Sequence, residues 1–298
     1  MKRAISSLFL FFVTLSVALA QAGSAQDWDK RIIAEEKANS ELMKNLEYLC
    51  DMIGPRMTGS DRMKHANEWT KDRFKDYGLE NVHLEGWRFS VPWYRGPASA
   101  NVVKPNGLPL GVTQMAWTPG TNGPREGRVV FVDIKEPKDL EKYAGELRDA
   151  WVLLGEPAKL SALPPEERKL RLPDTVITFQ QAPDTGQFRR MRQLAAMRDT
   201  LNKFLRSEMV AGIIRDAAKE HMLLNMTGSP ANLASLYPGA SFVDPITQVF
   251  MAHEHYAMLY RLLKRGEKVT VKMDLHSSMG KDTVDAYNTV AEIPGSEK

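Results

Sequence analysis

Tyr287-Asn-Thr-Val-Ala-Glu-Ile-Pro-Gly-Ser-Glu-Lys298 indicates how this chain is organised. Residues 290–293 predict a short β-strand, and Pro294-Gly295 is typical of a turn, because proline presets φ and glycine allows a positive φ. A strand followed by a tight turn ordinarily leads into a partner strand. No residues for that partner follow in the sequence, so we expect a hairpin that stops halfway and leaves a strand edge unpaired.

Residues 97–279, which precede this strand, predict a separate β-rich unit, because short apolar runs alternate there with glycine and proline. The predicted strands cover residues 100–103, 129–133, 151–154, 176–179, 210–214, 245–251 and 269–273. A helix is predicted for residues 255–265, and another for residues 188–206 with one buried face. The apolar residues of that face are Leu194, Met197, Leu201 and Leu205. We expect a β-sandwich or a small barrel with a few helices.

Residues 27–96 predict two helices followed by two strands. The first helix has an apolar face made of Leu42, Leu46, Leu49 and Ile53. The second has Met63, Ala66, Thr70, Phe74 and Tyr77 along one side, and Gly78 is the expected residue after its end. Residues 82–84 and 87–93 alternate as strands do. Because residues 284–298 return to a strand after the β-rich unit, we expect an α/β fold that contains an insertion.

The first residues have the layout of a secretory signal peptide. Lys2 and Arg3 precede an apolar run over residues 8–19, and Ala18-Leu19-Ala20 offers a cleavage site after residue 20. Cleavage after Ala25 and an uncleaved anchor are the alternatives. We therefore expect a secreted or periplasmic protein, with no further stretch long enough to span a membrane.

Composition excludes some classes of protein. Of the 298 residues, 43% are hydrophobic and 26% are charged, which is ordinary for a globular protein of one large domain or two smaller ones. The net charge of +3 is too small to imply binding of nucleic acid. Cys50 is the single cysteine, so it forms no intrachain disulfide, and we expect it to be buried as a small hydrophobe.

Side chains that carry chemistry are sparse. His253-Glu254-His255 has the composition of a metal site, and in a strand the two histidines would share a face. The favoured interpretation is instead a junction where a helix starts, with Glu254 as an acid in its first turn. The sequence has no glycine-rich phosphate loop, no Gly-x-Ser-x-Gly, no His-Glu-x-x-His and no Cys-x-x-Cys.

These features together resemble a known family. Leu49-Cys-Asp-Met-Ile-Gly-Pro-Arg-Met-Thr-Gly-Ser60 resembles the entry segment of secreted zinc exopeptidases, the group that includes carboxypeptidase Q and related aminopeptidases. Glu254-His255-Tyr256, within residues 246–273, is similar to the last part of the protease-associated domain inserted in that family. Residues 287–295 look like the strand that re-enters the peptidase domain. The similarity continues at Trp69, Gly78-Leu79, Val82, Trp93-Tyr94-Arg95-Gly96, Leu259 and Leu262-Leu263.

The resemblance implies an incomplete peptidase α/β/α domain, formed by residues 27–96 and 284–298, with a protease-associated domain inserted over residues 97–279. The family's active site holds two zinc ions bound by His, Asp and Glu, and a metal-bridged water is activated by a glutamate base. Those residues follow the re-entry strand, so no catalytic, cofactor-binding or metal residue is assigned here. Peptides are the implied substrates of the full-length enzyme, and a homodimer stays open.

Three hypotheses follow. In the first, the chain is the front part of a secreted zinc exopeptidase and is inactive alone, and the sequence does not separate carboxypeptidase from aminopeptidase activity. In the second, it is a non-catalytic protein whose protease-associated domain binds peptides or a partner. In the third, a second polypeptide completes the metal site. An unpaired strand edge argues against the second hypothesis, because such an edge invites aggregation.

Overall fold

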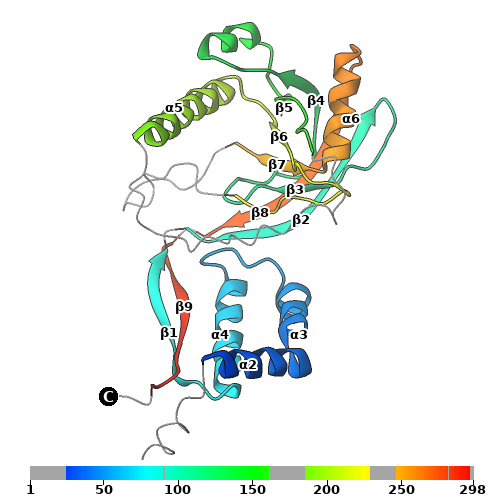
Figure 1. Cartoon of the computed structure of the whole chain (residues 1–298). Coiled ribbons are helices and arrows are strands. Elements are labelled where there is room, and N and C mark those ends of the chain that lie inside the picture. Colours follow the sequence, from blue (N-terminus) through cyan, green and yellow to red (C-terminus); the bar gives the residue numbers. More distant parts are fainter. Residues whose placement is uncertain (1–24, 90, 161–184, 229–245, 281, 296–298) are drawn as a thin grey trace, which may run out of the picture. The chain divides into compact units, whose positions relative to one another are not determined.

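The computed structural model describes residues 25–89, 91–160, 185–228, 246–280 and 282–295 (Figure 1). The chain divides into two compact units, Met1–Gly54 and Pro55–Lys298. The predicted signal peptide of residues 1–20 and the predicted strand of residues 176–179 lie outside the described residues. Within the described part of the chain, none of the helices combines the length and the apolar character needed to cross a bilayer.

The first unit consists of helices. They are α2 (Ala25–Asn39), α3 (Leu42–Glu47) and the π-helix η1 (Tyr48–Ile53), which ends at Gly54 with a φ of 76°. The predicted apolar face is only partly correct, because Ile53 is buried whereas Leu42 is 66% exposed. Cys50 is exposed, so its predicted burial is wrong. The prediction assumed a continuous α-helix, and the wider π-turn changes the direction of each side chain after residue 48.

The second unit begins with α4 (Asp61–Asp76), whose ends follow the sequence closely. The Ser60 hydroxyl caps the amino end by accepting a hydrogen bond from the Met63 N–H at 3.2 Å. At the other end Gly78 has a φ of 77°. The Gly78 N–H donates to the Lys75 carbonyl and the Leu79 N–H to the Phe74 carbonyl. This is the double hydrogen bond of a Schellman motif, so the predicted helix end is confirmed.

Residues 290–292 of the predicted strand belong to β9 (Val284–Glu292), which ends before Ile293 and pairs antiparallel with β1 (Glu80–Phe89). The sequence carries no sign of this partner, because β1 lies about 200 residues earlier in the chain, and the expected absence of a hairpin partner after the Pro294-Gly295 turn stays a prediction. Helix α4 contacts this pair through Asn67, which exchanges hydrogen bonds with the Thr289 side chain. Among the described residues, β1 and β9 form a sheet of two strands, so β9 is paired on one side.

Seven strands form the larger sheet, in the order β2-β8-β4-β5-β6-β7-β3 (Figure 1). They are β2 (Trp93–Lys104), β3 (Val112–Gln114), β4 (Arg125–Val132), β5 (Trp151–Leu154), β6 (Gly212–Asp216), β7 (Gln248–Met251) and β8 (Thr270–Met279). The four strands from β4 to β7 are parallel, and the remaining pairs are antiparallel. The connections contain the 3-10 helix η2 (Pro137–Tyr143) and the helices α5 (Thr185–Ser207) and α6 (His253–Lys264).

The two edge strands of this sheet meet. The Leu110 N–H donates to the Ala100 carbonyl of β2 just before β3 begins. The buried Gln114 side chain, in β3, donates to the Pro97 carbonyl at 3.0 Å and to the His276 carbonyl at 2.8 Å. The strands thus curl into one partly closed barrel, and the predicted alternative of a two-sheet sandwich is wrong.

Side chains alternate between the two faces of the sheet along each strand, and apolar residues are buried on both faces. Trp151 and Leu153 of β5 join the larger core cluster, which also contains Tyr256 and Leu259 of α6. Val152 points the other way, into a second cluster that contains Leu205 of α5. Figure 1 accordingly shows α5 and α6 on different sides of the sheet. The predicted α/β fold class is confirmed.

Only part of the predicted buried face of α5 is buried. Leu205 is fully buried and Leu201 is half-buried, as expected. Leu194 is 71% exposed, although it lies on the same side of the helix. The helical period identified the side of the helix correctly, but the core covers that side only near the carboxyl end of α5.

Candidate functional site

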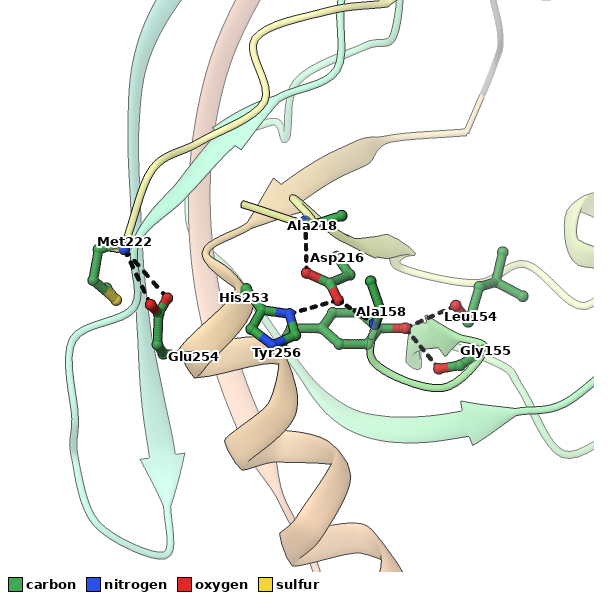
Figure 2. Close-up of polar contacts among 9 residues, drawn as sticks. All are labelled: Leu154, Gly155, Ala158, Asp216, Ala218, Met222, His253, Glu254 and Tyr256. Atoms are coloured by element: carbon green, nitrogen blue, oxygen red, sulfur yellow. Dashed lines mark hydrogen bonds and ion pairs between the residues drawn. The ribbon is translucent and has the colours of Figure 1, made fainter. Parts of the chain in front are cut away.

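The carboxyl ends of the parallel strands are the natural place to look for a site, because ligands of open α/β sheets bind there. In this sheet β5 ends at Leu154, β6 ends at Asp216, and β7 leads directly into α6. The polar side chains that meet at this edge are shown in Figure 2.

Asp216 accepts three hydrogen bonds. One of its oxygens lies 2.8 Å from the Ala158 nitrogen and 2.9 Å from His253 Nδ1. The other accepts from the Ala218 N–H at 2.8 Å. The carboxylate therefore joins the segment after β5, the loop after β6 and the start of α6. Because its oxygens are occupied by donors in a largely buried position, Asp216 is a structural anchor.

Glu254 binds the loop that follows β6. Both carboxylate oxygens lie 3.3 Å from the Met222 nitrogen. Hydrogen bonds from the backbone N–H groups of Glu254 itself, Met222 and His221 lower the pKa of this carboxyl group, although its partial burial acts the other way. A carboxylate in the first turn is also favoured by the helix dipole. Glu254 therefore remains charged and holds Met222 against the amino end of α6.

The His255 side chain contacts the segment that precedes β3. Its Nδ1 accepts a hydrogen bond from the Gly111 N–H at 2.9 Å, so the ring is neutral and carries its proton on Nε2. Partial burial lowers the pKa of this imidazole, and the Glu254 carboxylate opposes that effect.

Helix geometry explains these three directions. Consecutive residues of an α-helix point about 100° apart, so His253 and His255 diverge instead of sharing a face. The predicted start of a helix, with Glu254 as an acid of the first turn, is confirmed. The partners Asp216, Met222 and Gly111 come from distant parts of the chain, and sequence spacing gave no signal for them.

Tyr256, in the first turn of α6, is the last member of this cluster of polar side chains. Its hydroxyl lies 2.7 Å from the Leu154 carbonyl oxygen and 2.9 Å from that of Gly155, and its one proton is donated between them. Burial raises the pKa of the phenol, so it stays a neutral donor. Tyr256 thus ties α6 to the end of β5.

These residues do not fit a zinc site. Zinc in proteins is held by three or four His, Cys, Asp or Glu side chains that converge on the metal. No group of three or more such side chains is arranged to hold a metal ion within the described ranges. Asp216 and His253 meet as a pair, and Glu254 and His255 turn to backbone N–H groups instead. We therefore derive no catalytic step through zinc at this position.

Trp93-Tyr94-Arg95-Gly96 has a structural part in closing the barrel. The Arg95 guanidinium lies 4.9 Å from the centre of the Trp93 ring and donates to Thr113 and Gln114 of β3. Burial lowers the pKa of Arg95 to about 10, so it remains a cation at neutral pH. At Gly96 an added Cβ would lie 2.5 Å from the His276 carbonyl oxygen, which requires glycine there.

Comparison with known proteins gives the following matches. Carboxypeptidase Q of Rattus norvegicus is 27% identical over 263 residues, which are 88% of this chain and 47% of that protein. Carboxypeptidase Q of Homo sapiens is 26% identical over the same shares. Over most of its length the chain is therefore similar to carboxypeptidase Q. The predicted resemblance to zinc exopeptidases is confirmed, and no protein-family model matches.

A solved structure supports the fold. The peptidase M28 precursor from Shewanella amazonensis superposes with a TM-score of 0.59 at 21% sequence identity, covering 91% of this chain and 54% of that one. The chain spans about half the length of the curated relatives of the carboxypeptidase Q group that it matches.

Proposed function

We propose that this chain is part of a secreted zinc exopeptidase that removes terminal residues from peptides. The observation that carries the proposal is the similarity to carboxypeptidase Q along 88% of the chain, which spans only 47% of that relative. In such an enzyme the zinc ligands would lie in the half that this chain does not cover, because no three His, Cys, Asp or Glu side chains among the described residues are arranged to hold a metal ion. We further propose that this chain binds no zinc by itself and has no peptidase activity.

The proposed domain division rests on strand pairing. Residues 80–89 and 284–292 pair with one another, while the strands between them build the seven-stranded sheet. This supports the proposed peptidase domain of residues 27–96 and 284–298 with a protease-associated domain of residues 97–279 inserted, except that the inserted sheet already begins with β2 at Trp93. Within the described part, β9 has a partner on one side, so further strands of a peptidase sheet can be added at its other edge.

Metal content and activity test this proposal. The 298-residue chain and a longer product of the source gene would be purified, and both assayed for zinc and for hydrolysis of dipeptides. We expect the longer product to bind about two zinc ions and to release amino acids, and to lose activity when the metal is chelated. The 298-residue chain should contain no stoichiometric zinc. Stoichiometric zinc or hydrolysis by this chain alone would contradict the proposal.

One observation favours a second candidate, a non-catalytic module that binds peptides or a partner. The seven-stranded sheet has its own buried clusters, so residues 93–279 contain the core of a self-sufficient unit. Sequencing the gene beyond codon 298 separates the candidates. A reading frame that continues into a strand with His-x-Asp supports the peptidase, whereas a stop codon supports the module or an enzyme completed by a second polypeptide.

A further inference from the structure

The hydrogen bond from the Gly111 N–H to His255 Nδ1 has an unusual place in the sheet. Strand β3 is three residues long and pairs with β7, with Val112 opposite Met251. One step further, the Ala252 N–H donates to the Gly111 carbonyl at 2.9 Å, so the ladder continues past both strand ends. Helix α6 then begins, and the next acceptor for the Gly111 N–H is the His255 ring.

The imidazole thus replaces a backbone carbonyl as the last acceptor of this ladder. A carbonyl does not titrate near neutral pH, whereas an imidazole does. When His255 gains a proton, both ring nitrogens become donors, and Nδ1 can no longer accept from Gly111. Two donors would then face one another in a partly buried place, so the contact opens.

We propose that the His255–Gly111 contact is an acid-sensitive switch, which frees the amino end of β3 when the His255 ring becomes protonated. This inference does not depend on the proposed peptidase function. Freeing this end has consequences for the barrel, because β3 also carries Thr113 and Gln114, the residues that close the sheet against β2.

The other charged side chains near His255 do not bind the Gly111 N–H. The segment of residues 105–111 carries no ionisable side chain. The end of β6 supplies Asp216, which is bound to His253, and the loop after it supplies the pair Glu220 and His221. The contact of His253 differs from that of His255, because His253 Nδ1 faces a carboxylate acceptor whereas His255 Nδ1 faces an N–H donor.

The sign of the effect follows from burial. Burial lowers the pKa of His255 below the ordinary value of about 6.5, so the unfolded or opened form binds the proton more tightly. The contribution of this contact is therefore complete above that value and is lost as the pH falls. The pKa of Glu254 lies below the ordinary value of a carboxyl group, so this carboxylate stays charged at the pH at which the His255–Gly111 contact opens. The hydrogen bonds from the Met222 N–H to Glu254 therefore remain.

Amide hydrogen exchange measured by NMR on the 298-residue chain tests the switch. Protection factors, corrected for intrinsic exchange rates, would be followed from about pH 7.5 to about pH 5. We expect the protection of the Gly111 amide to fall by up to about tenfold per pH unit once the pH is below about 6.5, the ordinary imidazole value that the opened form has. The Met222 amide should keep its protection over this range and serves as the internal reference.

Two variants sharpen the test. In His255→Asn the side-chain oxygen lies at the same position as Nδ1 and accepts without titrating, so the protection of Gly111 should become independent of pH. His253→Asn is the matched control and should keep the response of the wild-type chain. Constant protection of Gly111 in the wild-type chain would overturn the proposal, whatever the variants do. An unchanged fall in His255→Asn, or a parallel fall at Met222, would overturn it as well.

Discussion

At the scale of single residues, Tyr256 gives the clearest case of a side chain that fixes one element to another. Its hydroxyl is fully buried and is the donor to the carbonyls of Leu154 and Gly155. Tyr256→Phe removes that donor and leaves the two partly buried carbonyls without it, so we expect a loss of about 1–3 kcal/mol in the free energy of unfolding. Urea denaturation followed by fluorescence measures this loss.

Tyr260→Phe is the matched control for that prediction. The Tyr260 hydroxyl donates to Glu156 at 2.9 Å in an exposed position, where water replaces the lost partner. We expect this variant to change the free energy of unfolding by less than about 0.5 kcal/mol. Equal losses in the two variants would mean that the hydrogen bonds of the buried Tyr256 hydroxyl contribute no more than the exposed one of Tyr260.

Gly96 tests close approach at the same scale. An alanine Cβ there would meet the His276 carbonyl oxygen at 2.5 Å and the His276 Cβ at 2.9 Å, so β2 and β8 must move apart. We expect Gly96→Ala to destabilise the chain by about 1–3 kcal/mol in thermal or urea unfolding. Gly86→Ala is the control, since its Cβ would meet the Tyr287 ring at an ordinary 3.4 Å. A neutral result for Gly96→Ala would show that the two strands separate without cost.

At the scale of elements, helix α4 depends on its amino-terminal cap. Ser60 is buried, and its hydroxyl accepts the Met63 N–H. We expect Ser60→Ala to cost about 1 kcal/mol and Ser60→Thr, which keeps the hydroxyl, to cost clearly less. Hydrogen exchange of the Met63 amide reports the cap directly. Protection of Met63 that is equal in the two variants would show that the cap hydrogen bond has no such role.

Elements with local signals were predictable from the sequence, and those set by distant contacts were not. The end of α4 at Gly78 follows from capping chemistry, and the start of α6 is indicated by Glu254 as an acid of its first turn; both signals lie within a few residues. Strand β3 was missed, because three residues are too few to display an alternation. In the candidate site, the helix start was predicted, but its partner Asp216 comes from another strand.

At the scale of the whole molecule, the pairing of β1 with β9 joins segments that lie about 200 residues apart in the chain. The seven-stranded sheet is built entirely between them in sequence, so this pairing defines where the chain leaves and re-enters the first part of the second unit. Pairing between such distant segments must overcome a large loop-closure entropy. A substitution that weakens this pairing therefore shows whether the β1–β9 pair and the seven-stranded sheet unfold separately.

Thr289→Pro provides that test. Thr289 lies in β9 opposite Leu84, and proline removes its backbone N–H and fits poorly within a strand. We expect the lost strand pairing to cost about 1.4 kcal/mol. The amides of residues 83–89 in β1 should therefore lose at least about tenfold in protection from hydrogen exchange. The seven-stranded sheet should keep its protection, because its two larger buried clusters contain no residue of β1 or β9. Thr289→Val, which keeps the N–H and removes only the contact with Asn67, should affect β1 less. Loss of protection in both sheets together would mean that the second unit unfolds as one, and that the inserted sheet does not stand by itself.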